Sequence, residues 1–240
     1  MADTAIVVTG MGVITPAGCS LDDLWAALLA GESTAATFTD AAYDGLPVRF
    51  GCQVRGLEAG HTLTAEETHG LDSYALYALT AALAAYEDAG SPSPDPERGT
   101  VAIGNGVAGQ ASLERQTRNY LAGGPAAVAP ETMQQVMPHA GSRIATRLGW
   151  RGPTLYISTA CASSGNAVGE GLELLRAGRV DVVIAGGSEA TLTPYVLAGF
   201  ANLQALSRRV EDPAGASRPF DADRDGFVMG EGAAFVVLER

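Results

Sequence analysis

The chain has 240 residues, enough for one large domain or two small ones, and it is 47% hydrophobic with 30 glycines, which indicates close packing of helices on sheets rather than disorder. Its formal net charge is -12 and all 15 basic residues are arginines, which argues against a nucleic-acid-binding protein, because phosphate contacts need a basic surface. No apolar run approaches the length of a membrane span, and the first residues lack the regions of a signal peptide. We therefore expect a cytoplasmic protein.

The first half of the chain is predicted to hold two buried strands and two helices. The first strand is Ala5–Thr9, closed by Gly10 and Gly12. Ser20 is a helix N-cap for Leu21–Ala30, and Gly31 ends that helix. An irregular stretch over Thr34–Gly60 precedes a long packed helix, Thr68–Asp88, a proline-rich loop and the second strand, Thr100–Ile103.

In the second half, strands and helices alternate. A helix over Glu131–Leu148 is either broken or entered near Pro138, and a small-residue helix over Ala162–Ala177 ends at Gly178. The predicted strands are Thr154–Ser158, Asp181–Ala185 followed by a Gly-Gly turn, and Ala233–Glu239. Apolar strands alternating with helices predict an α/β fold, in one domain over residues 1–240, with a mainly parallel sheet covered on both faces.

Two motifs resemble known sites without meeting their requirements. Gly104-Asn-Gly-Val-Ala-Gly109 fits GxGxxG, but a dinucleotide site needs a helix opening here, and the next predicted helix opens at Glu131. Asp221-Ala-Asp-Arg-Asp-Gly226 begins like a calcium loop, but Gly232 stands where such a loop needs Glu. We expect no cofactor and no metal, and interpret the glycine-rich turn as a place of close backbone packing or approach to a ligand tail.

The three cysteines, Cys19, Cys52 and Cys161, are too widely spaced for a CxxC metal site and odd in number, so no disulfide framework is expected. Cys161 lies in TLYISTACASSG (Thr154–Gly165), where an apolar strand ends and a helix begins. The first N–H groups of a helix have no internal partner, and the helix dipole makes that end positive. Both effects favour a nucleophilic thiolate and an oxyanion hole at Cys161, although a buried structural cysteine is the alternative.

The chain resembles the β-ketoacyl synthases of the thiolase superfamily, nearly from end to end. The resemblance rests on several ordered motifs: VVTGMGVITPAG (Val7–Gly18), STACASSG (Ser158–Gly165), AGGSEA (Ala185–Ala190), the segment from Gly199 to Ser207, and SRPFDADRDGFVMGEGAAFVVLE (Ser217–Glu239). It implies the N-terminal half of a thiolase-like fold, βαβαβαββ, with a mixed, mainly parallel sheet covered by helices. The last motif favours the synthase branch over the thiolases.

The resemblance also implies roles for individual residues. Cys161 would be acylated by a thioester of an acyl carrier protein or of coenzyme A, and its N–H would form half of the oxyanion hole. Val107 matches a position that lines the acyl tunnel, and Phe200 matches one near the tunnel and its entrance. For Val107 and Phe200, ordinary core packing is the alternative.

Full-length members of this family are roughly twice as long as one half of the fold, and their catalytic histidines, lysine and glycine-rich loop belong to the second half. His61, His69 and His139 match none of those positions. The resemblance thus implies a separate partner chain that supplies the histidines, in an assembled unit that dimerises. A truncated fragment would give the same sequence.

The leading functional hypothesis is decarboxylative Claisen condensation with a malonyl extender, in fatty-acid or polyketide synthesis. A non-catalytic partner subunit, like the chain-length factors, is the alternative, but those usually lack the cysteine. The carrier protein would be acidic and would need a locally basic docking face. Arg143, Arg147 and Arg151 recur every four residues and would share a helix face if the helix extends that far, although an ordinary solvated face is the simpler interpretation.

Overall fold

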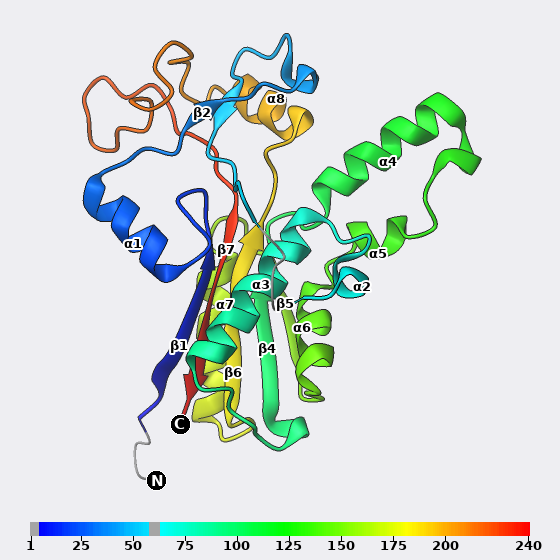
Figure 1. Ribbon diagram of the computed structural model, residues 1–240, viewed down its shortest axis with the longest axis vertical. Helices are drawn as coiled ribbons and strands as arrows, with labels where there is room; N and C mark the ends of the chain where they lie inside the picture. The colour runs from blue at the N-terminus through cyan, green and yellow to red at the C-terminus, as the bar shows by residue number, and fades with distance from the viewer. Residues whose placement is uncertain (1–4, 58–62) are drawn as a thin grey trace.

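The computed structural model describes residues 5–57 and 63–240. Its centre is a five-stranded sheet in the order β1-β7-β6-β4-β5 (Figure 1). β4 pairs in parallel with β5 and β6, whereas β7 pairs antiparallel with β6 and β1, so within this described sheet β7 alone is reversed. The strands are β1 (Val7–Ile14), β4 (Gly99–Gly104), β5 (Thr154–Ile157), β6 (Val182–Glu189) and β7 (Gly232–Glu239). The predicted mixed, mainly parallel sheet is therefore confirmed.

Helices cover both faces of this sheet, because alternate residues of each strand point to opposite sides. On one face, α3 (Ser73–Asp88) and α6 (Ala140–Leu148) pack on a cluster that includes Val101, Ile103 and Ile184. On the other, α7 (Ser163–Arg176) packs on the intervening residues Ala102, Val183 and Ala185. The order of the main elements is βαβαβαββ, as expected.

The remaining elements lie beside and above the sheet (Figure 1). They are α1 (Leu21–Ala30), β2 (Ala36–Thr37), β3 (Phe50–Gly51), α2 (Ala65–Thr68), α4 (Gln110–Gly123), α5 (Thr132–Val136) and α8 (Pro194–Asn202), with single turns of 3-10 helix at Ala41–Tyr43, Pro96–Arg98 and Pro125–Ala127. Within the described residues, no helix combines the length and the apolar character needed to cross a bilayer.

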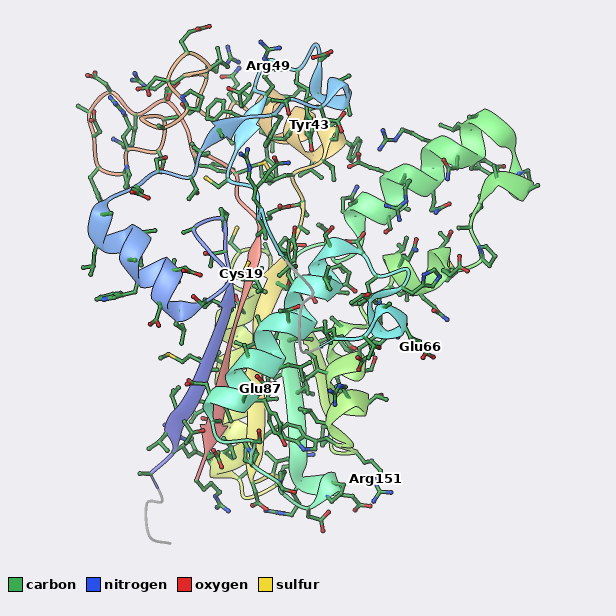
Figure 2. The ribbon with its side chains drawn as sticks, in the orientation of Figure 1. Cys19, Tyr43, Arg49, Glu66, Glu87 and Arg151 are labelled. Atoms are coloured by element: carbon green, nitrogen blue, oxygen red, sulfur yellow. The ribbon has the colours of Figure 1, made fainter. Side chains whose placement is uncertain are left out.

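A small upper layer stands above the carboxyl ends of the parallel strands. It joins α8 to the β2–β3 pair through an apolar cluster that includes Phe38, Phe50 and Leu197. The Tyr43 hydroxyl donates to the Leu192 carbonyl at 2.7 Å, which ties this layer to the segment that follows β6. Figure 2 shows Tyr43 in this layer, with the exposed Arg49 above it, and Cys19 near the upper end of β1.

The glycines of β1 do not end the strand, so its predicted boundary is wrong. β1 continues through Gly10 and Gly12 to Ile14 because these residues let α3 approach the sheet. A Cβ atom on Gly10 would lie 2.3 Å from the Ala85 carbonyl oxygen, and one on Gly12 would lie 2.1 Å from that of Ala81. The predicted Gly-Gly turn after Asp181–Ala185 is also wrong, because β6 continues through both glycines to Glu189.

Helix boundaries were predicted best where a capping residue marks them. Ser20 caps α1 by accepting from the Asp23 N–H at 3.1 Å, and Gly31 ends it in the left-handed conformation, as predicted. α3 begins at Ser73 rather than at Thr68, because Asp72 provides its cap. The predicted break near Pro138 is confirmed by the gap between α5 and α6. α4 was not predicted.

Candidate active site

Cys161 lies at the tip of a tight turn between β5 and α7, and its side chain is exposed. The residue before it, Ala160, has a φ of +52°, a conformation that residues other than glycine rarely adopt. The donors that close this turn are the amides of Ala162, to the Thr159 carbonyl, and of Ser163, to the Ala160 carbonyl, each at 3.2 Å. The amide of Cys161 is not among the donors that close this described turn.

Hydrogen bonds of the Ser163 side chain fix the turn. This residue is buried, and its hydroxyl accepts from the Thr159 N–H at 2.9 Å and lies 2.6 Å from the Ala160 carbonyl oxygen, to which it donates. Asn166, one turn along α7, donates to the Thr159 hydroxyl at 3.1 Å. Side chains from two turns of α7 therefore hold Thr159 and Ala160, the two residues that precede Cys161.

Two glycines allow the start of α7 to lie directly on the sheet. A Cβ atom on Gly104, at the end of β4, would be 2.3 Å from the backbone of Ser163. A Cβ atom on Gly187, in β6, would be 2.7 Å from the Ser164 side chain. Real Cβ atoms essentially never come closer than 3.0 Å to such neighbours, so larger residues at either position would displace the helix terminus that carries Cys161.

Cys161, Val107 and Phe200 all line one cavity of about 830 Å³ at the carboxyl ends of the parallel strands. Val107 is 55% exposed and Phe200 is 36% exposed, so neither is an ordinary core residue. Phe200 packs edge-on against Phe227, with ring centroids 5.6 Å apart. The other lining residues come from segments 14–16, 104–106, 160–164, 187–196 and 227–234. The structure thus brings the three predicted residues together around one mostly apolar space.

Glu189, at the end of β6, holds the glycine-rich turn in the wall of this cavity. Its Oε2 accepts from the N–H groups of Gly106 at 2.5 Å and Val107 at 3.3 Å. Its Oε1 is buried and has no hydrogen-bond partner among the described residues. Burial raises the pKa of the Glu189 carboxyl, and the bonds from the turn only partly oppose this. Glu189 was not among the predicted site residues, although its place at the end of an apolar strand is a signal that could have identified it.

A second carboxylate, the half-buried Glu231, lies just before β7 and lines the same cavity. Its Oε1 accepts from the Val54 N–H at 2.9 Å and from the Tyr77 hydroxyl at 3.2 Å. Burial is the main cause that raises the pKa of the Glu231 carboxyl. Glu231 therefore links the loop after β3 to α3 and β7, and it too was not among the predicted site residues.

The histidines that the structure describes lie elsewhere. His69 is an exposed residue at the end of α2. His139 precedes α6, where its Nδ1 lies 3.3 Å from the Tyr74 hydroxyl and 2.9 Å from the Met137 carbonyl. His61 falls outside the described residues. Among the residues that are described, the cavity therefore presents a thiol and two carboxylates but no imidazole.

Comparison with known proteins gives this site a family. A family model for the N-terminal domain of β-ketoacyl synthases matches residues 3–240. The chain belongs to the β-ketoacyl synthase family. It is 38% identical over 237 residues to the 3-oxoacyl-[acyl-carrier-protein] synthase 2 of Synechocystis sp., an alignment that covers 98% of this chain and 57% of that protein.

Solved structures of ketosynthases share the fold. A β-ketoacyl synthase from Burkholderia phymatum has a TM-score of 0.88 at 33% identity, over 98% of this chain and 59% of the other. A type II polyketide synthase acyl carrier protein in complex with its ketosynthase bound to the hexaketide has a TM-score of 0.85 at 31% identity, over 98% and 57% of the two chains. This ketosynthase-family chain therefore spans less than three fifths of the relatives it matches, and the part it spans is the N-terminal one.

The two motifs set aside in the sequence have structural uses in this ketosynthase domain. Contrary to expectation, a helix, α4, does open after the GxGxxG turn. A dinucleotide site also needs an acidic residue about 20 residues further on, at the end of the next strand. Here the next strand begins only at Thr154, so that requirement is not met. In the acidic loop, Asp225 accepts from the Ser207 hydroxyl at 2.7 Å and the Arg208 N–H at 2.9 Å. Asp221 accepts from the Asp223 N–H at 2.8 Å.

The predicted arginine face is not formed. α6 ends at Leu148 with Gly149 in the left-handed conformation, so Arg151 lies beyond the helix. Arg147 forms an ion pair with Glu67 at 2.8 Å. Figure 2 shows Arg151 at the lower end of the sheet, away from the upper layer that holds Tyr43. The helix ends because a glycine interrupts it, and the spacing of the arginines does not reveal that stop.

Proposed function

We propose that Cys161 accepts the acyl group of a thioester and is the nucleophile of a β-ketoacyl synthase. The observation that carries this proposal is an exposed thiol on a braced strand-to-helix turn, facing a mostly apolar cavity that Val107 and Phe200 also line. An apolar space of this kind suits a fatty or polyketide acyl chain, and a helix start suits developing negative charge.

The chemical step is acyl transfer between two sulfur atoms. The Cys161 thiolate attacks the carbonyl carbon of the thioester, and the new C–S bond gives a tetrahedral oxyanion. The backbone N–H of Cys161 serves as one donor to that oxyanion. Collapse of the intermediate breaks the bond to the donor's sulfur, which leaves as a thiolate and takes up the proton that Cys161 lost.

The second step, condensation, needs groups beyond this chain. A malonyl extender must lose CO₂, and the resulting enolate must be stabilised before it attacks the acyl group on Cys161. Residues 1–240 form a single domain that is the N-terminal half of the enzyme, and a C-terminal half on a separate chain supplies the histidines. The relatives are longer than this chain, so their remaining part lies outside the aligned region.

An acyl carrier protein is the proposed donor and partner, in fatty-acid or polyketide synthesis. Support comes from the names of the relatives, since one is a 3-oxoacyl-[acyl-carrier-protein] synthase and one is a ketosynthase solved with its carrier protein. The assembled unit would work as a dimer. A non-catalytic subunit like the chain-length factors is the second candidate, and a piece of a longer ketosynthase is the third.

Co-expression with the neighbouring reading frame tests the split arrangement. The chain alone should accept an acyl group but should not condense malonyl and acyl thioesters, whereas the co-purified pair should do both. If the purified chain is a stable monomer that condenses the two thioesters unaided, the split-enzyme proposal is wrong. If neither the chain nor the pair becomes acylated, the non-catalytic candidate takes its place.

A further inference from the structure

Two features of Phe220 are energetically unfavourable: the exposure of its side chain and the conformation of its backbone. Its side chain is 101% exposed, the highest value among the large hydrophobic residues that the structure describes. Its φ is +66°, in the left-handed region that bulky residues avoid. The Asp221 N–H donates to the Arg218 carbonyl at 3.3 Å, so Pro219 and Phe220 are the central residues of a turn. A turn with this φ at its third residue normally has glycine there.

The loop that carries Phe220 is held by its own polar groups. The Arg218 Nε donates to the Gly215 carbonyl at 3.0 Å, and the Arg224 guanidinium donates to the Asp221 carbonyl at 2.8 Å. Arg209 reaches across from the preceding segment and donates to the Asp223 carbonyl at 2.7 Å. The exposed ring is therefore part of a fixed turn and not of a freely moving segment, as in a preorganised binding surface.

Phe220 also lines a groove of about 850 Å³ that is separate from the acyl cavity but adjoins it. The groove is lined mostly by apolar atoms and includes Gln204, Ala205, Pro219, Phe220, Arg224 and Phe227. Phe227 is shared, because it lines the acyl cavity as well and packs on Phe200. Whatever fills the groove therefore touches the wall of the candidate active site.

The length of the relatives indicates what fills it. This chain matches the N-terminal domain and covers 57% of its Synechocystis relative, so more than two fifths of that protein lies outside the aligned region. A second copy of this chain would not supply the region of the relatives that lies outside the alignment. A part that completes the same enzyme is the simpler occupant, since Phe227 lines both the groove and the cavity of the candidate active site.

We infer that Phe220 and its groove, residues 204–205 and 217–227, are a docking site for the C-terminal part of the synthase, with Phe220 as the aromatic anchor. The inference rests on the proposed function only in taking that part as the partner. Binding would bury the exposed ring, which offsets the cost of its backbone conformation. Aromatic residues in such positions often carry much of the binding energy of an interface.

The test co-expresses the tagged chain with the C-terminal part of the Synechocystis relative that this chain does not cover, and measures the amount retained on the tag. Phe220→Ala and Phe220→Gly should each reduce retention at least tenfold. Phe220→Gly also relaxes the turn, so the melting temperature of the isolated chain should not fall. Ser91→Gly is the matched control, because Ser91 is an exposed residue with a φ of +56° in the turn after α3, and its retention should equal that of the unaltered chain.

Three results would overturn the inference. The first is no retention by the unaltered chain, and the second is equal retention by both Phe220 variants. The third is self-association of the chain alone that Phe220→Ala abolishes, which would assign the groove to a second copy. Acylation of Cys161 in the isolated Phe220 variants should match that of the unaltered chain. Loss of acylation in every sample with retention intact would contradict the proposed function and leave the docking site standing.

Discussion

At the scale of single residues, the backbone of Ala160 has an unusual conformation next to the candidate nucleophile. Its φ of +52° allows the chain to reverse and present Cys161, and it is accessible to alanine only at some cost. We predict that Ala160→Val lowers the free energy of unfolding by about 2 kcal/mol, because a branched side chain fits this conformation poorly. Urea denaturation measures this loss, and acylation of Cys161 should slow at least tenfold.

The matched control is Ala160→Gly, which keeps the conformation and should not lower the unfolding free energy. A valine variant as stable as the unaltered chain would show that the turn is not strained in solution. Slow acylation in the glycine variant as well would point to a role for the Ala160 methyl group and away from the backbone conformation.

Glu231 makes the stability of the folded chain depend on pH, and the direction of its raised pKa fixes the sign of that dependence. Burial raises the pKa of this carboxyl above its ordinary 4.5, so between 4.5 and the raised value the folded chain holds a proton that the unfolded chain has lost. Its contribution to stability is therefore full below pH 4.5 and is lost as the pH rises through the folded-state value.

We predict that Glu231→Gln removes the part of the pH dependence of stability that Glu231 causes. The glutamine amide oxygen can still accept from the Val54 N–H and the Tyr77 hydroxyl, but the side chain cannot ionise. Urea midpoints at pH 5 and pH 7 should lie closer together in the variant than in the unaltered chain. Equal slopes in the two proteins would mean that Glu231 does not titrate differently on folding.

At the scale of elements, the position of α7 depends on small residues beneath its first turn. We predict that Gly187→Ala lowers the free energy of unfolding by about 1–3 kcal/mol, since its Cβ would lie 2.7 Å from both the Ser164 side chain and the Gly104 carbonyl oxygen. The same change should slow acylation by moving the helix terminus that carries Cys161.

Gly169→Ala is the control on the same helix. A Cβ atom there has no neighbour within 4 Å, so the helix should gain about 0.5–1 kcal/mol from the substitution. If both substitutions shift stability in the same direction, the close approach at Gly187 does not govern the seating of α7.

The elements also show what the sequence could and could not predict. Capping residues such as Ser20 and apolar strands such as β4 predicted their elements well, because their signals are local. Gly12 and Gly187 were interpreted as strand breakers, although their role is to admit a neighbouring helix, which depends on partners far along the chain. α4 was missed because its exposed, polar sequence carries a weak apolar pattern and its N-cap, Gly109, has no side-chain cap bond.

At the scale of the whole molecule, the fold collects residues from distant segments at the carboxyl ends of its parallel strands. The sequence predicted Cys161, Val107 and Phe200 as site residues, and the structure places all three on one cavity. It could not predict that Glu189 and Glu231 share that cavity, because their partners, Val107, Val54 and Tyr77, come from other elements.

Large apolar side chains also remain on the surface of the described chain. Trp25, Leu28 and Leu29 of α1 are 63%, 62% and 71% exposed. Exposed apolar patches of this kind mark interaction surfaces. We predict that the chain alone binds an apolar fluorescent dye such as ANS, and that co-purification with the C-terminal part reduces the signal per chain at least twofold. An unchanged signal would mean that the C-terminal part does not cover these residues.

The central claim is that Cys161 takes the acyl group, and intact-mass spectrometry with peptide mapping tests it most directly. The purified chain is incubated with acyl thioesters from acetyl to palmitoyl, and Cys161→Ala and the double variant Cys19→Ser, Cys52→Ser are treated alike. We predict a mass increase of one acyl group in the unaltered chain and in the double variant, mapped to Cys161, and none in Cys161→Ala. An adduct that persists in Cys161→Ala, or no adduct with any thioester, would contradict it.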